Sequence, residues 1–310
     1  MKKKKDKQSK ERDNRCVEKI IKLYCTVCQC NNDSRFLCTK QRLSNNNCPQ
    51  FTDDELITVY LWGKEKQLPT RKAIYKYTKE VLNEWFPKLP SYQAFCRRLN
   101  RLADAFRVLA EIMSEMTMTK AVQTNAYVVD SCPIMLAKDS RSNQAKVWRE
   151  YCSLTRNPIK NQWYHGVKLH VFGLLQPKAL PIPCAMLISP ANVCDLWAAQ
   201  QAVRDCSPIR NGRLFADRAY IDADWSQLMR EQYNIEVITP RKKKKYDIVF
   251  SSDSFSSFVS SVRQPIEPFF NWINFKTGIQ NASFVRSAQG LLFHVFSALA
   301  FISLSLFFNY

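Results

Sequence analysis

A change of hydrophobic periodicity near residue 119 constrains the fold of this chain more than any other feature. Before it, apolar residues recur in alternating steps of four and three along one segment: Phe95, Leu99, Leu102, Phe106, Leu109, Met113 and Met116. That spacing places them on one face of a helix, for which Ser91 is the expected cap. After Thr119 the apolar residues gather in short β-prone runs. The sequence therefore predicts a helical segment that leads into an α/β domain.

Local signals refine both halves of this scheme. Thr52 and Glu55 have the spacing of a capping box, and a second helix is expected from Thr70 to Trp85. Asn192 and Asp195 are expected to be a helix cap and its third residue. Strands are expected at 126–129, 167–174, 185–188, 214–216 and 236–239, and a further helix at 224–232. This order predicts a mixed sheet with helices on its faces.

The balance of charge favours a nucleic-acid partner. The 310 residues include 46 Lys and Arg against 27 Asp and Glu, a formal net charge of +19, and a polyanion is the usual partner of such a chain. Hydrophobic residues make up 46% of the chain, which excludes wholesale disorder. With only 6 Gly, the sequence contains no glycine-rich phosphate-binding motif.

The amino-terminal region carries a lysine run and several cysteines. No apolar segment follows Met1–Arg12, so it is not expected to be a secretory signal, and the thiols are expected to be reduced in a cytoplasm. Cys25 and Cys28 form a CxxC, with Cys38 and Cys48 further on, which raises the hypothesis of a zinc site. A structural zinc site usually has a second close pair. Both a zinc site and unrelated thiols therefore stay open.

Three carboxylates stand in apolar surroundings. Asp130 and Asp217 each end an apolar run, and Glu267 is flanked by Ile266 and by apolar residues that follow. Singly, each acid is explained by a turn cap or, for Glu267, by a pair with Arg263 one helical turn earlier. An acid at the end of a core strand nevertheless needs a partner or a metal. Together, the three predict an oxygen-rich site for two Mg²⁺ or Mn²⁺ ions that act at phosphorus.

In order and context these motifs resemble those of DDE insertion-sequence transposases. The acidic motifs read Val-Val-Asp130-Ser, Phe-Ala-Asp217-Arg-Ala-Tyr and Arg263-x-x-x-Glu267, and Tyr164-His-Gly-Val-Lys-Leu-His resembles the strand between the first two acids in many members. The resemblance implies a ribonuclease H-like catalytic fold in which the three acids are the catalytic residues and the metal ligands. The implied chemistry is metal-dependent cleavage at transposon ends, followed by attack of a freed DNA 3′-hydroxyl on target DNA.

The resemblance covers the chain from Phe51 to its end. Leu89-Pro-Ser-Tyr-Gln-Ala-Phe-Cys-Arg-Arg-Leu99 resembles the amino-terminal helical segment of one small family within the group. We therefore expect a basic tail and a Cys- and Asn-rich connector over 1–50, an all-α DNA-binding domain over 51–120 and the ribonuclease H-like domain over 121–310. The implied partners are the double-stranded DNA of terminal inverted repeats and target, and a second copy of the chain. The implied location is the bacterial cytoplasm, in association with the nucleoid.

Several cations are candidate DNA contacts beside these motifs. Arg97 and Arg98 lie on the outer face of the helix that begins at Ser91, which is a candidate second helix of a helix-turn-helix. The run from Arg241 to Lys245 is as well explained by a solvated loop as by phosphate contact. The full set of candidates is Lys168, Arg218, Arg263, Lys276, Arg97, Arg98, Arg241 and Lys243.

Two features support other functions. Many relatives have a Lys seven residues after the catalytic Glu, where this chain has Asn274. That departure favours the alternative of a catalytically decayed, DNA-binding regulator. The apolar segment Leu291–Phe308 is long enough to span a bilayer, which would suit a membrane-anchored basic protein. A fully buried helix has the same signature, and we favour burial because Glu267 lies close before it and must reach DNA.

Overall fold

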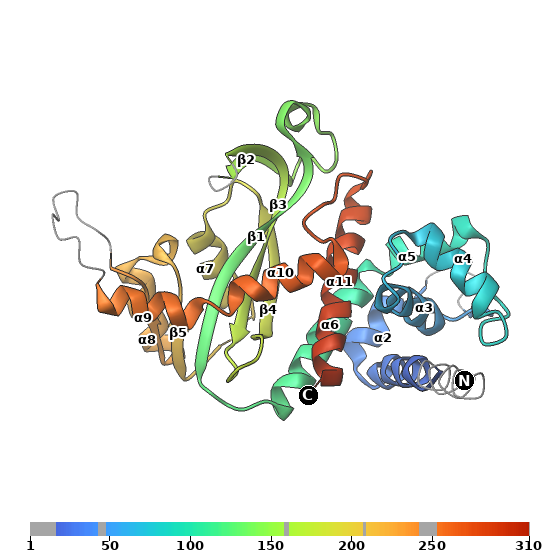
Figure 1. Ribbon diagram of the computed structural model, residues 1–310, viewed down its shortest axis with the longest axis horizontal. Coiled ribbons are helices and arrows are strands. Elements are labelled where there is room, and N and C mark those ends of the chain that lie inside the picture. The colour runs from blue at the N-terminus through green and yellow to red at the C-terminus, as the bar shows by residue number, and fades with distance from the viewer. Residues whose placement is uncertain (1–16, 43–47, 158–160, 207–208, 242–252, 310) are drawn as a thin grey trace, which may run out of the picture. The chain divides into compact units, whose positions relative to one another are not determined.

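The computed structural model describes residues 17–42, 48–157, 161–206, 209–241 and 253–309 (Figure 1). They fall into two compact units. Unit 1 comprises Met1–Ile112 and Leu292–Phe301, and unit 2 comprises Met113–Leu291 and Ile302–Tyr310. The domain limits at 50 and 120 expected from the sequence stay a prediction.

The amino-terminal part of unit 1 is helical. Its elements are a helix over 17–29, η1 (Cys30–Asn32), α2 (Ser34–Lys40), α3 (Asp53–Glu65), α4 (Arg71–Val81), α5 (Tyr92–Arg101) and the first part of α6 (Ala103–Lys120). The capping box is confirmed, because the Thr52 hydroxyl accepts the Glu55 N–H at 3.1 Å and the Glu55 carboxylate accepts the Thr52 N–H at 2.5 Å. Thr70 caps α4, which ends before the predicted Trp85.

The predicted apolar stripe is shared by two helices instead of one. The Ser91 hydroxyl accepts the Ala94 N–H and begins α5, but α5 ends at Arg101 and α6 begins at Ala103. The six stripe residues from Phe95 to Met113 are fully buried, whereas Met116 is 38% exposed. The prediction of one helix was wrong because a break at a single residue, Leu102, leaves the phase of the stripe unchanged.

Asp53 holds the helices of unit 1 together through ion pairs. Its carboxylate lies 2.7 Å from the guanidinium of Arg42, 2.7 Å from that of Arg98 and 2.5 Å from that of Arg101. Burial alone would raise the pKa of Asp53, but the bonds from these arginines outweigh it and lower the pKa below its ordinary value. The Arg98 guanidinium also donates to the Phe51 carbonyl, so its hydrogen bonds are made within unit 1.

Unit 2 is built on one mixed sheet, as predicted. Its strands are β1 (Ala126–Lys138), β2 (Ser153–Asn157), β3 (Gln162–Leu174), β4 (Ile182–Pro190), β5 (Gly212–Phe215) and β6 (Ile235–Ile238). β1, β3 and β4 form an antiparallel ladder, and β5 and β6 continue from β1 in parallel. The short strand β2 pairs with the first residues of β3. This arrangement is consistent with a ribonuclease H-like transposase domain.

Helices cover both faces of the sheet (Figure 1). The helical elements of unit 2 are η2 (Asp139–Gln144), α7 (Asp195–Cys206), η3 (Arg218–Tyr220), α8 (Ala223–Tyr233), α9 (Ser254–Arg263), α10 (Ile266–Thr277) and parts of α6 and α11 (Ala288–Asn309). Val129 and Leu214 pack in one core with residues of α7 and α8, such as Ala202. On the other side of the sheet, Phe215 meets Phe258 of α9 and α10 packs along β1.

α10 is tied to β1 at both ends. Ahead of it, Arg263 at the end of α9 contacts Asp130 of β1 at 3.3 Å. Beyond it, Met135 of β1 donates to the Gln280 carbonyl and accepts from the Ala282 N–H, each at 2.9 Å. Arg263 therefore pairs with Asp130 and not with Glu267, which was the structural alternative for that acid, and a turn separates α9 from α10.

α11 is the one helix in the described part of the chain that is long and apolar enough to cross a membrane. Of its most apolar 18-residue window, 72% is buried. Within unit 2, the Ser303 hydroxyl bonds to that of Ser114 at 3.0 Å in buried surroundings. Burial of this extent is what a core helix shows, in agreement with the reading favoured from the sequence.

Candidate active site

Asp130, within β1, and Asp217, two residues after β5, occupy equivalent positions relative to the parallel pairing of these two strands. In the ladder between β1 and β5, Val128 pairs with Phe215, and each acid follows its paired residue by two positions. Since side chains alternate along a strand, Asp130 and Asp217 face the same side of the sheet as Phe215, the side covered by α9 and α10. The two carboxylates thus meet at the carboxyl end of a parallel pair, where open α/β sheets bind ligands.

Asp130 is a carboxylate with little compensation for its charge. Its Oδ1 accepts the Ser131 N–H at 2.8 Å and its Oδ2 lies 3.3 Å from the Arg263 guanidinium. Burial, with the nearby charges of Asp217 and Asp195, nevertheless raises its pKa from 3.8 to about 6. Further positive charge at this position would therefore be bound favourably.

The turn after β5 orients Asp217 and buries a tyrosine beside it. The Asp217 carboxylate accepts the Ala219 N–H at 2.8 Å and caps η3. The Tyr220 hydroxyl is buried, and its pKa is raised well above 10 by burial and by the surrounding carboxylates, so it stays protonated. Neither this hydroxyl nor the Nε of Arg263 has a hydrogen-bond partner among the described residues. Two buried donors therefore remain unused next to the acids.

Glu267 lies on the helix that covers these acids but apart from their cluster. It is in the first turn of α10, four residues after Arg263, and its side chain is exposed. Pro268 shares that first turn, where its missing N–H has no intrahelical partner to lose. Over the described ranges, no three Asp, Glu, His or Cys side chains are grouped to hold a metal. The structure brings Asp130 and Asp217 together and leaves Glu267 outside that pair.

Asp195 belongs to a second polar cluster that sequence reasoning missed. Its Oδ1 accepts from the Lys168 Nζ at 2.8 Å and from the Ser131 hydroxyl at 3.1 Å. The expectation that Asp195 is the third residue of a capped helix was wrong, because α7 begins at Asp195 itself. The only signal of this cluster in the sequence is an acid, Asp195, directly before an apolar helix, and an acid at that position is equally typical of a helix cap.

This second cluster lies on the opposite face of the sheet from Asp130. Ser131 pairs with His170 on β3, and adjacent residues of a strand point to opposite faces. Burial, with the charge of Lys168, lowers the pKa of His170 to about 4, so this histidine is neutral at physiological pH. Its Nε2 bonds to the Ser189 hydroxyl at 2.8 Å. The cluster therefore supports the strands that carry the acids.

Three of the predicted DNA contacts are instead engaged in internal ion pairs: Arg263 with Asp130, as described above, and Lys168 and Arg98 with other acids. Lys168 bonds to Asp195 and to the Val193 carbonyl, each at 2.8 Å. Arg98 bonds to Asp53. Both cations serve packing in this structure because their charges are matched by partly buried acids.

The remaining predicted cations differ in exposure. Arg97 and Arg218 are exposed, and neither forms an ion pair with the residues that the structure describes. Arg241 is also exposed and lies 3.8 Å from Asp253. Lys276 is half-buried in the last turn of α10, and Lys243 lies outside the described residues.

A family model for the transposase DDE domain matches residues 120–281, slightly more than half of the chain. The chain belongs to the DDE transposase family. The match runs from the end of α6 through the sheet to the segment after α10, so it contains Asp130, Asp217 and Glu267. Transposases of this family act on DNA and generally use divalent metal ions. No curated protein and no solved structure matches this transposase.

The carboxylates of this transposase fit such metal ions. Asp130 and Asp217 offer hard oxygen donors on one face, and the raised pKa of Asp130 shows that Arg263 alone does not compensate its charge. The amino-terminal cysteines give no comparable site. Cys25 and Cys28 lie on the helix over 17–29, and no metal-binding group is formed by the cysteines that the structure describes.

Proposed function

We propose that this transposase cuts DNA at the ends of its mobile element and joins the freed 3′-hydroxyls to target DNA. The observation that supports the proposal is the register of β1 and β5, in which Asp130 and Asp217 each follow a paired residue by two positions. The proposed fold of unit 2 is ribonuclease H-like, with α10 as the helix that brings the third acid. Membership of the DDE transposase family supports both points.

Asp130 and Asp217 would hold the metal ions, and Glu267 would complete the second of two sites from α10. When bound, Mg²⁺ or Mn²⁺ supplies Lewis-acid activation of the attacking oxygen and stabilises charge on the leaving oxygen. Arg263 orients the Asp130 carboxylate through the 3.3 Å contact of its guanidinium. The buried Tyr220 hydroxyl retains its proton, because its pKa is raised well above 10.

The DNA would be held by exposed cations of both units. Arg218 follows Asp217 directly, and Arg241, Lys276 and Arg97 are further candidates because they lie at least partly exposed. The DNA substrates would be the terminal inverted repeats and the target duplex. Two copies would act together, since strand transfer requires two ends to be held at once. A bacterial, cytoplasmic protein associated with the nucleoid suits this activity.

Cleavage of DNA that carries the flanking terminal repeats tests the proposal. The wild-type protein should cut in Mg²⁺ or Mn²⁺ and not in EDTA, and Asp217→Asn should lose at least about 100-fold in rate while it still binds the duplex. Asp224→Asn is the matched control, since Asp224 is an exposed acid in the first turn of α8. Asp130→Asn should behave like Asp217→Asn.

Two outcomes would overturn the assignment. Cutting by Asp217→Asn at the wild-type rate would show that the metal site is elsewhere. Tight binding of the ends with no cutting in any metal would favour the alternative of a catalytically decayed DNA-binding regulator. This alternative is supported by one observation: Glu267 does not form a three-acid group with Asp130 and Asp217 among the described residues.

A further inference from the structure

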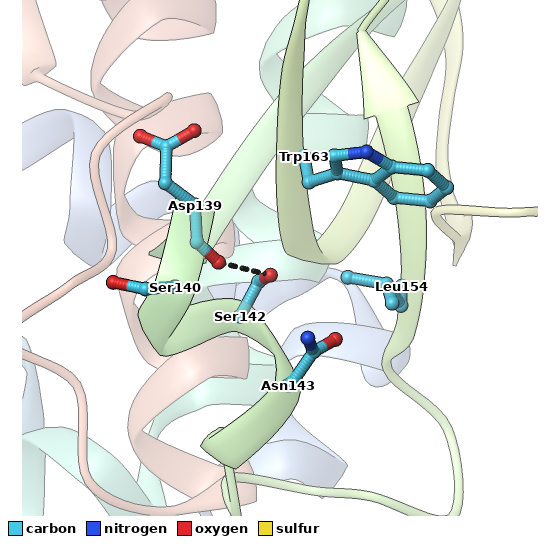
Figure 2. Close-up of a pocket in the computed structure, with 6 residues that line it drawn as sticks. All are labelled: Asp139, Ser140, Ser142, Asn143, Leu154 and Trp163. Atoms are coloured by element: carbon cyan, nitrogen blue, oxygen red, sulfur yellow. Dashed lines mark hydrogen bonds between the residues drawn. The ribbon is translucent and has the colours of Figure 1, made fainter.

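A pocket of about 460 Å³ lies at the far end of β1 from Asp130. It forms where η2 leaves β1 and folds over the β2–β3 hairpin, and its lining residues are Asp139, Ser140, Ser142, Asn143, Leu154 and Trp163. Figure 2 shows the indole of Trp163 and the side chain of Leu154 on one side, and the Asn143 carboxamide facing them from η2. Its volume falls in the range of about 300–1,000 Å³ usual for small-molecule sites.

The walls of the pocket are held in place by local hydrogen bonds. The Ser142 hydroxyl donates to the Asp139 carbonyl at 2.5 Å and fixes the turn of η2 (Figure 2). The Gln162 amide donates to the Asp139 carboxylate at 2.8 Å and ties that turn to β3. In the β2–β3 ladder Arg156 pairs with Trp163, which fixes the backbone position of the tryptophan. The site therefore exists before any ligand arrives.

The chemistry of the pocket suits a flat ring with a polar edge. Trp163 is 50% exposed and Leu154 is 38% exposed, and no other described aromatic ring stacks on the indole. Exposing two large apolar side chains over one hollow is unfavourable without a ligand. Opposite them, the Asn143 carboxamide makes no hydrogen bond with the described residues, so it has a donor and an acceptor to offer. A nucleobase presents both a π-face and such an edge.

The charge around the pocket suits a nucleic-acid strand. Residues 138–156 carry five exposed cations, Lys138, Arg141, Lys146, Arg149 and Arg156, and two exposed acids, Asp139 and Glu150. This excess of positive charge would hold the phosphates on either side of a base.

We propose that this pocket binds an unpaired base of the DNA on which the transposase acts, with the base stacked on Trp163 and read by Asn143. Lys138 lies eight positions after Asp130 on β1, a span of about 26 Å at about 3.3 Å per residue. For DNA that runs along β1, this span corresponds to about eight base pairs at about 3.4 Å per base pair. The inference rests on the proposed function for the identity of the DNA, but its binding test does not require cleavage.

Binding of single strands by the full-length protein tests the pocket. The probes are a labelled oligothymidylate of about eight nucleotides and a fully paired duplex of the same length, followed by fluorescence anisotropy. Trp163→Ala should weaken binding of the single strand by about tenfold or more, as expected for the loss of one stacked base, and should change duplex binding by less than about twofold. Trp163→Phe should retain most of the single-strand affinity, because it keeps an aromatic face.

Trp197→Ala provides the matched control. Trp197 is 52% exposed on α7, so its loss removes a similarly exposed indole outside the pocket. Circular dichroism should show both alanine variants folded. The inference is overturned if Trp163→Ala binds the single strand as the wild type does, if Trp197→Ala loses as much, or if thymidine monophosphate competes as well as the oligonucleotide.

The two proposals fail in different ways. A wild-type protein that cuts terminal-repeat DNA, together with a Trp163→Ala variant of unchanged single-strand affinity, removes only the pocket. A wild-type protein that cuts no DNA in any metal, together with the Trp163 effect on single strands, removes only the cleavage proposal. Single-strand binding by Asp224→Asn should equal that of the wild type in either case.

Discussion

Asp130 is a half-buried acid whose surroundings disfavour its charge. The side chain is 25% exposed, one guanidinium touches it, and two other carboxylates act on it from nearby. The pKa of this carboxyl group is about 6 in the folded protein, against an ordinary value of 3.8. Between these two pH values, the folded state therefore binds more protons than the unfolded state. The free energy of unfolding must then fall as the pH rises between these two values.

We predict that Asp130→Asn removes this part of the pH dependence. The variant should match the wild type near pH 4 and exceed its free energy of unfolding by about 3 kcal/mol near pH 7, since one pKa unit corresponds to about 1.4 kcal/mol. Urea denaturation at the two pH values measures the difference, and added Mg²⁺ should narrow it. A difference that is the same at both pH values would contradict the assignment.

Arg97 and Arg98 are sequence neighbours in opposite environments. Arg97 is exposed on α5, whereas the Arg98 side chain is 11% exposed and bonded to Asp53. Arg97→Ala should weaken duplex binding and change the free energy of unfolding by no more than about 0.5 kcal/mol. Arg98→Ala should lower the free energy of unfolding by about 1 to 3 kcal/mol, because it removes a partner from a buried carboxylate.

Urea denaturation and duplex binding of the two variants separate these roles. Each variant serves as the control of the other, since both remove an arginine from the same helix. Equal losses of stability would show that the Asp53 cluster does not hold unit 1 together. Unchanged duplex affinity in Arg97→Ala would remove Arg97 from the DNA-contact set.

At the scale of elements, α10 depends on a short connection to β1. The Asn274 carboxamide accepts the Gln280 N–H at 3.2 Å, and the Gln280 carbonyl accepts the Met135 N–H at 2.9 Å. Asn274 thus closes the turn that anchors the carboxyl end of α10 to the strand that carries Asp130. This is a structural reason for an asparagine where many relatives of the insertion-sequence group have a lysine.

We predict that Asn274→Lys does not increase DNA cutting and lowers the free energy of unfolding by about 1 kcal/mol, the usual contribution of one hydrogen bond. Asn274→Asp keeps an acceptor at the same position and should retain the stability of the wild type. Denaturation of both variants measures the change in stability, and cleavage assays on both measure the change in DNA cutting. A gain of cutting in Asn274→Lys without loss of stability would instead support the decayed relative.

At the scale of the whole molecule, the charge is unevenly distributed along the sequence. Residues 2–12 contain six of the lysines and one arginine against Asp6 and Glu11. A basic segment of this kind raises DNA affinity without sequence preference, because each phosphate that it neutralises releases a counterion.

We predict that deletion of residues 2–12 makes duplex binding less dependent on salt. The slope of log affinity against log salt should become shallower by as much as about 6, at about 0.9 for each of the seven cations that neutralises a phosphate. Duplex binding measured between about 50 and 200 mM salt gives the slope. An unchanged slope would show that this segment does not contact the duplex.

Local rules in the sequence determined the class of the fold and the position of two acids. Periodicity and capping located α3, the start of α4 and the cores of the predicted strands, because these depend on residues within a few positions of each other. The same rules placed Asp130 and Asp217 directly after apolar runs, but the structure places only Asp217 beyond the end of its strand, whereas Asp130 lies within β1. Periodicity missed the length of β1, where polar residues and Pro133 interrupt the apolar run after Val129.

Only the tertiary structure decided which charges meet. Asp53 forms ion pairs with Arg42 and Arg98, which are distant from it in the sequence. Lys168 forms an ion pair with Asp195, and Arg263 forms one with Asp130 and not with Glu267. Spacing along the chain cannot predict such pairs, because strand register and helix packing set the distances between residues that are far apart in sequence. The sequence by itself thus determined an α/β transposase with two acids directly after apolar runs, and the packing of helices on the sheet decided the partner of each charge.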